Sequence, residues 1–235
     1  MNLIEMNSIC KSYRNIGFET KVLKDVPLHI KEGDYVSIIG PSGAGKSTLM
    51  AIMGCLAQPT SGEYILDYEE VGKLNDRKLS RVRNEKIGFV FQAFHLLPGV
   101  TALENVILPF VYAKNPPSNI KERARELLAK VGLEHRLHHT PGQLSGGEQQ
   151  RVTIARSLVN DPRIILADEP TGNLDSKNGV ETMKTFDNLI KEGKTIVLIT
   201  HDSEVAKHAG RIISILDGQI ASDSNVNYEE QARSL

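Results

Sequence analysis

A glycine-rich turn between an apolar run and a helical pattern is the feature that most constrains the fold of this chain of 235 residues. Residues 35–39 form a short run suited to a strand buried on both faces. Gly40, Gly43 and Gly45 follow within six residues, and apolar side chains then recur at helical spacing from Leu49 to Leu56. A strand that passes through glycines directly into a helix is a typical unit of an α/β fold.

Three more apolar runs are equally short and also end in polar residues. Residues 87–91 end at Gln92, residues 164–167 end at Asp168 and Glu169, and residues 195–200 end at His201. Runs of this kind are typical of parallel strands that helices cover on both faces. Because ligands of such sheets bind beyond the carboxyl ends of the strands, these polar residues are candidate site residues.

An alternating strand precedes these runs, and a helical segment interrupts them. Residues 26–30 alternate with a period of two, and a short strand is expected at residues 64–66. Helical patterns run from residue 120 to Gly132, which is the expected stop, and from Ser145 onward. We expect a single domain over residues 1–235, with an α/β core at 1–92 and 161–220, a helical subdomain at 93–160 and a loose polar tail at 221–235.

The overall composition excludes several classes of protein. Lys and Arg number 28 against 29 Asp and Glu, so the chain lacks the positive excess of a sequence-independent nucleic-acid binder. The 40% hydrophobic and 24% charged residues are typical of a globular protein. No apolar stretch approaches the roughly 18 residues of a membrane span, and the first residues lack a signal-peptide pattern. Since Cys10 and Cys55 are too few for a disulfide scaffold, we expect a soluble cytoplasmic protein.

The first glycine cluster carries a complete phosphate-binding motif. Residues 40–47 read Gly-Pro-Ser-Gly-Ala-Gly-Lys-Ser, which matches G-x-x-x-x-G-K-[ST]. Glycines let backbone N–H groups surround phosphate oxygens, and the following helix adds its positive N-terminal end. Lys46 is expected to reach the β- and γ-phosphates, and the Ser47 hydroxyl to bind Mg²⁺. A chance turn is the alternative, but the flanking strand and helix favour a nucleoside triphosphate site.

Two carboxylates after a buried strand form the second motif. Asp168 stands where phosphate-loop NTPases place the Asp that holds Mg²⁺. The adjacent Glu169 is expected to point the other way and to polarise an attacking water. The alternative is that Asp168, Glu169 and Pro170 only end a strand before a turn, but the complete phosphate loop favours the catalytic interpretation.

The second glycine cluster, Leu144-Ser145-Gly146-Gly147-Glu148, lies at the start of a helix. Ser145 and Glu148 have the spacing of a capping box, which is sufficient to start a helix. A capping box does not need two consecutive glycines, which reduce helix stability, and their exposed N–H groups are suited to an anion. Since one ATP needs only one phosphate loop, we infer that this cluster serves a nucleotide held by another copy of the chain.

The order of these motifs resembles that of ATP-binding cassette (ABC) transporter ATPases. The resemblance covers about residues 3–220, and the serine-glycine-glycine signature distinguishes it from other phosphate-loop proteins. The matching residues are the loop with Lys46, Gln92, the signature at 144–148, Asp168, Glu169, Asp175 and His201. The resemblance implies an α/β P-loop NTPase core with a mostly parallel sheet, an N-terminal antiparallel β subdomain and an inserted helical subdomain.

The family also implies a catalytic and metal-binding set. Glu169 would be the catalytic base, and His201 would contact the γ-phosphate while it holds the water and Glu169 in place. Gln92 would contact Mg²⁺ and the attacking water and would sense a membrane partner. Ser47, Gln92 and Asp168 would bind the Mg²⁺.

A further set of residues is implied to bind nucleotide. Tyr13 would stack on adenine, Ser145 and Gly147 would close on the ATP of the opposite subunit, and Asp175 would line the dimer interface. Glu148 stands where the commonest family signature has Gln, and it keeps the capping box. The complete set is Tyr13, Gly40, Pro41, Ser42, Gly43, Ala44, Gly45, Lys46, Ser47, Thr48, Ser145, Gly146, Gly147, Glu148 and Asp175.

A finer resemblance concerns the branch of the family that contains macrolide and peptide exporters, lipoprotein-releasing ATPases and the cell-division ATPase. It rests on residues 54–56 with residues 59–62, on residues 88–92 with Leu96 and Leu97, and on residues 168–175. It implies an ATP-hydrolysing subunit that works as a homodimer and drives export or lipoprotein release through a separate integral-membrane permease. The implied place is the cytoplasmic face of the inner membrane, with a periplasmic or extracytoplasmic adaptor as a further partner and no nucleic acid.

Two other functions are compatible with ATP binding: a soluble ABC-type ATPase that acts on nucleic acid or ribosomes, and an ATP-binding regulatory scaffold. The first usually carries two cassettes or a coiled-coil insert, and this chain has neither.

Residues 93–113 contain one charged residue, Glu104, and suit either a core or a permease-docking surface. Residues 73–86 have an excess of four positive charges, suited to a solvated helix face or to anionic lipid. His135, His138 and His139 match no recognised metal-ligand spacing.

Overall fold

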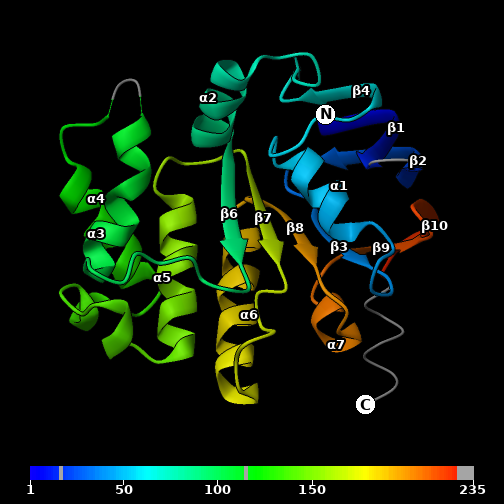
Figure 1. Cartoon of the computed structure of the whole chain (residues 1–235). Coiled ribbons are helices and arrows are strands. Elements are labelled where there is room, and N and C mark those ends of the chain that lie inside the picture. The colour runs from blue at the N-terminus through cyan, green and yellow to red at the C-terminus, as the bar shows by residue number, and fades with distance from the viewer. Residues whose placement is uncertain (16–17, 114–115, 227–235) are drawn as a thin grey trace. The chain divides into compact units, whose positions relative to one another are not determined.

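The computed structural model describes residues 1–15, 18–113 and 116–226, which form two units (Figure 1). The first unit comprises residues 1–74 together with the chain from residue 193 onward, and the second comprises residues 75–192. Within the described residues, no helix is both long and apolar enough to cross a membrane.

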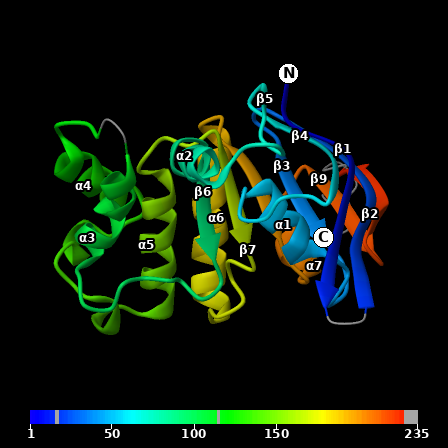
Figure 2. The ribbon, with the colours of Figure 1, turned by 45° about the horizontal axis from the view of Figure 1, so that its top comes forward.

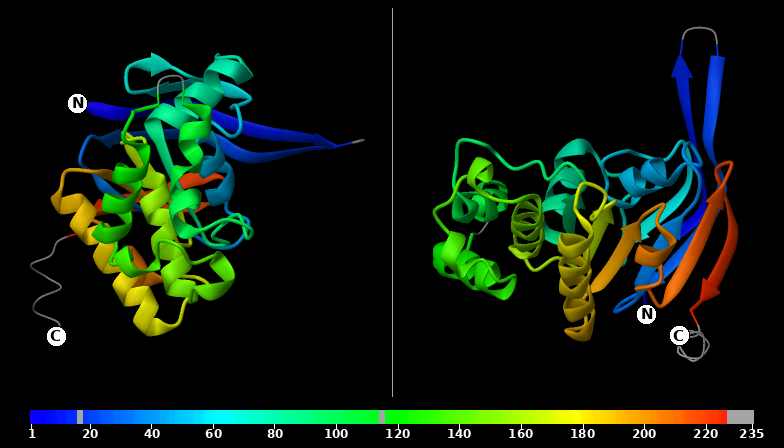
Figure 3. Two further views of the ribbon diagram at one scale, coloured as in Figure 1. Left: turned by 90° about the vertical axis from the view of Figure 1, so that its left-hand side faces the viewer. Right: turned by 90° about the horizontal axis from the view of Figure 1, so that it is seen from below.

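An antiparallel sheet forms the N-terminal part of the first unit. Its strands are β1 (Asn2–Asn15), β2 (Phe18–Lys31), β4 (Ser61–Leu66) and β5 (Glu69–Glu70), in the order β2-β1-β4-β5. Strands β1 and β2 make a long two-stranded ribbon (Figure 3). Val26, Leu28 and Ile30 are buried while Pro27 and His29 are exposed, which confirms the predicted alternation.

The second sheet of this unit contains two of the four predicted parallel strands. Its members are β3 (Tyr35–Ile39), β8 (Thr195–Ile199), β9 (Arg211–Leu216) and β10 (Gln219–Asn225), in the order β10-β9-β3-β8. Strand β3 pairs in parallel with both neighbours, whereas β10 is antiparallel to β9. Helices α1 (Lys46–Met53) and α7 (Ser203–Ala206) follow β3 and β8 (Figure 2).

The structure corrects the sequence prediction at the C-terminal end of this sheet. The loose tail predicted from residue 221 is wrong up to Asn225, because these residues continue strand β10. The guanidinium of Arg211 on β9 donates from Nε and from a terminal nitrogen to the two carboxylate oxygens of Asp223 on β10, at 2.7 and 2.6 Å. Backbone pairing and this ion pair hold a strand whose side chains are nearly all exposed. Residues 227–235 of the predicted tail lie outside the described residues.

The second unit combines two parallel strands with helices. Its elements are α2 (Asp76–Lys86), β6 (Ile87–Phe91), α3 (Ala102–Ile107), η1 (Leu108–Tyr112), α4 (Ile120–Lys130), η2 (Glu134–Arg136), η3 (Pro141–Gln143), α5 (Gly146–Leu158), β7 (Ile164–Asp168) and α6 (Ser176–Lys191). Strand β6 pairs in parallel with β7. Helices α3, α4 and α5 contact one another, and all described elements between residues 102 and 158 are helical (Figure 2).

Local signals explain where the helices of this unit begin and end. Thr101 and Glu104 form a capping box at the start of α3. Gly132, with φ of 75°, ends α4 as predicted, and the N–H of Leu133 bonds back to the Leu128 carbonyl at 2.7 Å. The buried Asn105 donates to the carbonyls of residues 97, 100 and 101, so it fixes the loop that leads into α3.

Candidate functional site

The phosphate loop occupies the junction between β3 and α1 in the first unit. A Cβ atom on Gly40 would lie 2.2 Å from the backbone oxygen of Ile215 in β9, so only glycine fits there. Gly45 precedes the first residue of α1 with φ of 105°, in the left-handed region. The backbone thus turns tightly over the end of β3 and enters α1 as a glycine-built cradle.

Lys46 is the first residue of α1, and its ammonium group reaches back over the loop. Nζ donates to the carbonyl oxygens of Gly40 at 2.7 Å and Pro41 at 2.9 Å. The Ala44 carbonyl accepts from the N–H of Gly218, which ties the loop to the β9–β10 turn at 3.1 Å. A glycine-rich loop with a cation at its rim fits a polyphosphate, because backbone N–H groups and the helix N-terminus both favour anions.

Two other predicted residues lie in the same unit. Tyr13 projects from β1 with 44% of its surface exposed, and Lys11 Nζ lies 5.1 Å from its ring centroid. His201 is exposed and comes two residues after the end of β8. The next residue, Asp202, caps α7 through the N–H of Glu204 at 2.8 Å. An exposed ring at Tyr13 is available for stacking, as predicted for an adenine contact.

Gln92 lies at the end of β6 in the second unit and is bonded to Asn173. The Asn173 side-chain amide donates to the Gln92 backbone oxygen at 2.9 Å, and Gln92 Nε2 donates to Asn173 Oδ1 at 3.3 Å. A Cβ atom on Gly172 would lie 2.6 Å from Gln92 Nε2. Gln92 is therefore held against the loop that follows the Asp168-Glu169 motif.

The two predicted carboxylates stand at the end of β7. Asp168 is the last residue of the strand, and Glu169 adopts a left-handed backbone with φ of 44°. Such a conformation is strained for a residue with a side chain, and strain of this kind clusters at functional sites. The Glu169 carbonyl accepts from the N–H of Gly172 at 3.0 Å, and the buried Gln150 donates to the Pro170 carbonyl at 2.8 Å.

The signature helix α5 begins with the predicted capping box. Ser145 Oγ accepts from the N–H of Glu148 at 3.2 Å, and the Glu148 carboxylate accepts from the N–H of Ser145 at 2.8 Å. The second carboxylate oxygen accepts from Nε of Arg136 at 2.9 Å. Burial of the Glu148 carboxyl opposes ionisation, but the bonds from Ser145 and Arg136 outweigh it, so its pKa is lowered. Arg136 was not predicted as a site residue, because no local sequence motif contains it.

Asp175 holds Asn178 of α6 in place, and Asn178 packs against the signature. The Asp175 carboxylate caps α6 by accepting from the N–H of Asn178 at 2.9 Å and from its side-chain amide at 2.6 Å. These two bonds lower the pKa of Asp175. A Cβ atom on Gly147 would lie 2.1 Å from Asn178 Oδ1. The signature glycine and the predicted interface residue thus belong to one packed cluster. Its central residue, Asn178, was not predicted from the sequence.

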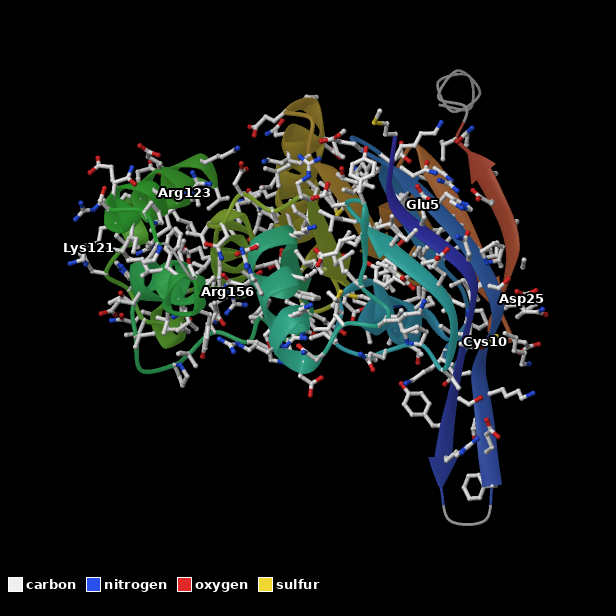
Figure 4. The ribbon with its side chains drawn as sticks, turned by 90° about the horizontal axis from the view of Figure 1, so that it is seen from above. Glu5, Cys10, Asp25, Lys121, Arg123 and Arg156 are labelled. Atoms are coloured by element: carbon white, nitrogen blue, oxygen red, sulfur yellow. The ribbon has the colours of Figure 1, made fainter. Side chains whose placement is uncertain are left out.

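Arg156 on α5 is a third residue of this region that no sequence motif predicted (Figure 4). Its guanidinium donates to the carbonyl oxygens of Phe94 at 2.8 Å and His95 at 2.6 Å. Burial lowers the pKa of this group. Phe94 and His95 both have left-handed backbones, with φ of 58° and 50°, so Arg156 fixes an irregular turn directly after Gln92.

The predicted site residues fall into two groups, one in each unit. The first unit holds Tyr13, the loop from Gly40 to Thr48, and His201. The second unit holds Gln92, Ser145, Gly146, Gly147, Glu148, Asp168, Glu169 and Asp175. The structure confirms the local conformation of the loop and of the signature. The assembly of both groups around one nucleotide stays a prediction.

The parallel strands, the glycine loop before α1 and the helical segment define an α/β P-loop NTPase, as the sequence predicts. The "ABC transporter" family model matches residues 23–172, and the chain belongs to this family. It is 53% identical over 218 residues to an uncharacterized ABC transporter ATP-binding protein of Thermotoga maritima, with 93% of each chain covered. It is also 50% identical to the macrolide export ATP-binding/permease protein MacB of Escherichia coli. This alignment covers 94% of this chain but only 34% of MacB.

Two solved structures of the cassette MJ0796 share the fold. One is a dimer in a post-hydrolysis state bound to ADP and Pi. Its sequence is 45% identical to this chain, the TM-score is 0.87, and the match covers 95% of this chain and 99% of the cassette chain. The other is a dimeric bacterial ABC transporter cassette, 47% identical with the same TM-score and coverage. This chain is therefore an ATP-binding ABC-type ATPase.

Proposed function

We propose that the chain is the ATP-hydrolysing subunit of an ABC exporter and works as a dimer in which two copies share each ATP. The observation that carries the proposal is the second glycine-built helix N-terminus, at Gly146 and Gly147. One ATP is served by the loop at Gly40–Thr48, so a second anion-binding end within the chain fits the nucleotide of another copy. The dimeric state of the MJ0796 cassettes supports this arrangement.

In this proposal the loop binds the triphosphate, and the two carboxylates perform the chemistry. Ser47, Gln92 and Asp168 offer uncharged and anionic oxygen donors, which fit Mg²⁺. When bound, Mg²⁺ supplies positive charge to the β- and γ-phosphate oxygens. Phosphoryl transfer of this kind depends on positioning and charge stabilisation.

Three residues position the attacking water in the proposed site. Glu169 accepts a proton from the water, and its left-handed backbone, directly after Asp168, is the kind of strain that clusters at functional sites. His201 contacts the γ-phosphate and holds the water and Glu169 in place. Gln92 contacts the water from the end of β6, where Asn173 restrains it.

The permease partner is supported by the surface of residues 93–113. Ala102, Leu103, Val106 and Phe110 are buried, so part of this apolar segment is core. Leu97, Val111 and Tyr112 are 46, 72 and 76% exposed, and they form the part that suits docking of an apolar partner. We propose that an integral-membrane permease contacts this surface, which places the subunit at the cytoplasmic face of the membrane.

The finer assignment follows the relatives. MacB proteins are named as macrolide export ATP-binding/permease proteins, and the chain spans about a third of their length. We propose export or lipoprotein release as the transport process, with an extracytoplasmic adaptor as a further partner. An ATPase that acts on nucleic acid is not favoured, because the net charge is −1.

Mixing two inactive variants tests the shared site. Lys46→Ala removes the cation that the loop offers to the phosphates and leaves the signature intact, whereas Ser145→Arg blocks the signature and leaves the loop intact. Each variant alone should lack turnover, while an equal mixture should recover about a quarter of wild-type turnover, because half of random dimers are mixed and contain one intact site. ATP binding by Ser145→Arg is the control for folding. A mixture as inactive as its components would overturn the shared site.

A further inference from the structure

Arg136, the last residue of η2, makes a charged contact with the signature and has no role in the proposed ATP site. Its Nε donates to Glu148 Oε1 at 2.9 Å, and a terminal nitrogen lies 3.1 Å from Nε2 of His139. The side chains of Arg136 and Glu148 are 35 and 15% exposed, so the pair is largely shielded from water. Shielding strengthens the attraction within a pair and raises the penalty for leaving one partner alone.

Glu148 presents an electrostatic problem for the helix end that contains it. Its carboxylate lies in the first turn of α5, where it stabilises the helix by bonding the N–H of Ser145. The same helix end is proposed to approach a triphosphate, which a bare carboxylate would repel. A cation bonded to the other carboxylate oxygen removes that net charge and leaves the capping box unchanged.

We propose that Arg136 is a positioning residue that neutralises Glu148 and thereby allows the signature to close on a nucleoside triphosphate held by a second copy of the chain. The inference rests on the proposed shared site. The planar guanidinium suits this role, because its fixed N–H directions hold the carboxylate while Ser145 occupies the other oxygen. Arg136 touches no substrate and acts through Glu148.

Dimer formation in the presence of ATP measures the effect directly. The experiment uses the full chain with Glu169→Gln, which is expected to bind ATP without hydrolysis, and determines the dimer dissociation constant by sedimentation. Adding Arg136→Met should weaken the dimer by about tenfold or more at low salt, because an unpaired carboxylate then opposes the triphosphate. Arg136→Lys should retain most of the affinity. Arg125→Met, which removes an exposed cation of α4, is the charge-matched control and should have little effect.

Rescue separates charge neutralisation from a structural role. Glu148→Gln preserves the capping box and removes the charge. In a protein that already carries Glu148→Gln, adding Arg136→Met should therefore change the dimer affinity by less than about threefold. The defect of Arg136→Met alone should shrink in high salt, since the Debye length falls from about 10 Å at 0.1 M to about 3 Å at 1 M. A merely structural contact would show neither the rescue nor the salt effect.

Three results would overturn the proposal, and they differ in what else they affect. An unchanged dimer in Arg136→Met, or an equal loss with and without Glu148→Gln, would refute the role of Arg136 and leave the shared site standing. A Glu169→Gln protein that binds ATP and never dimerises would refute the shared site together with the role of Arg136. Monomer ATP affinity and thermal stability, measured for each variant, identify any protein that has failed to fold.

Discussion

Gly147 of the signature helix lies against Asn178 of α6 so closely that no side chain fits between them. A Cβ atom on Gly147 would be 2.1 Å from Asn178 Oδ1 and 2.8 Å from Asn178 Cβ. Asn178 has little freedom to move away, because Asp175 accepts from both its backbone and its side-chain N–H groups. The start of α5 therefore packs directly against the start of α6, through Gly147 on one helix and Asn178 on the other.

Substitution of the two signature glycines should affect stability to very different degrees. A Cβ on Gly146 would meet Leu174 at an ordinary 3.5 Å, so Gly146→Ala should change the free energy of unfolding by less than about 0.5 kcal/mol. Gly147→Ala must displace Asn178 and should cost about 1–3 kcal/mol. Urea unfolding of the two variants measures the difference. Equal stability of the pair would show that Asn178 does not constrain Gly147.

Lys46→Ala should weaken nucleotide binding without unfolding the loop. The ammonium group bonds the carbonyl oxygens of Gly40, at a part-buried position, and of Pro41, at an exposed one. Since neither bond is fully buried, water can replace the ammonium group there. Loss of a charged hydrogen bond to phosphate costs about 1.5–3 kcal/mol, so ATP affinity should fall roughly 10- to 100-fold. A fluorescent ATP analogue provides the titration, with Lys73→Ala as a control that removes the same charge outside the loop. Unchanged affinity in Lys46→Ala would place the phosphates elsewhere.

Arg156→Lys should loosen the turn that follows Gln92. An ammonium group cannot reproduce the paired bonds to Phe94 and His95, so the variant should lose about 1–2 kcal/mol of stability. Amide hydrogen exchange of residues 93–96 should increase more than exchange in the rest of α5. Arg151→Lys is the matched control on the same helix, because its single contact with Glu181 suits either cation. Equal exchange in both variants would contradict the restraint.

Acid should remove the contribution of the Arg211–Asp223 pair. The bonds from Arg211 lower the pKa of Asp223 in the folded chain below its value in the unfolded chain. Its contribution is therefore complete above the unfolded pKa, near 4, and is lost as the pH falls through the folded pKa. Asp223 is 39% exposed, so screening limits the pair to about 1 kcal/mol at pH 7.

Comparison of Asp223→Asn with the wild type from pH 7 to pH 2.5 measures this loss. The stability difference should stay constant down to about pH 5 and shrink below it. Asp217→Asn, in the turn of the same hairpin, is the control. A difference that grew in acid would contradict the assigned direction.

Strands with buried, continuous apolar sequences could be predicted almost to the residue. Tyr35–Ile39 and Ile87–Phe91 have the predicted bounds, because Gly40 and Gln92 mark sharp ends. Strand β10 was missed because its residues are polar and exposed, and its pairing depends on β9. Leu56, predicted on the helix after the loop, lies beyond the end of α1 and is 55% exposed.

The candidate site shows the same division between local and long-range information. The glycine loop and the capping box each consist of consecutive residues, so the sequence predicts both. Arg136 reaches Glu148 across 12 positions and Arg156 reaches Phe94 across 62. Contacts of this kind follow from helix packing and leave no short pattern in the sequence.

Sedimentation of the Glu169→Gln protein is the most direct test of a site shared between two copies. The variant keeps the phosphate loop and the signature and lacks the proposed base, so bound ATP should persist. With ATP it should sediment as a dimer at micromolar concentration, and with ADP or without nucleotide as a monomer. A protein that binds ATP and remains monomeric across this range would contradict the shared site.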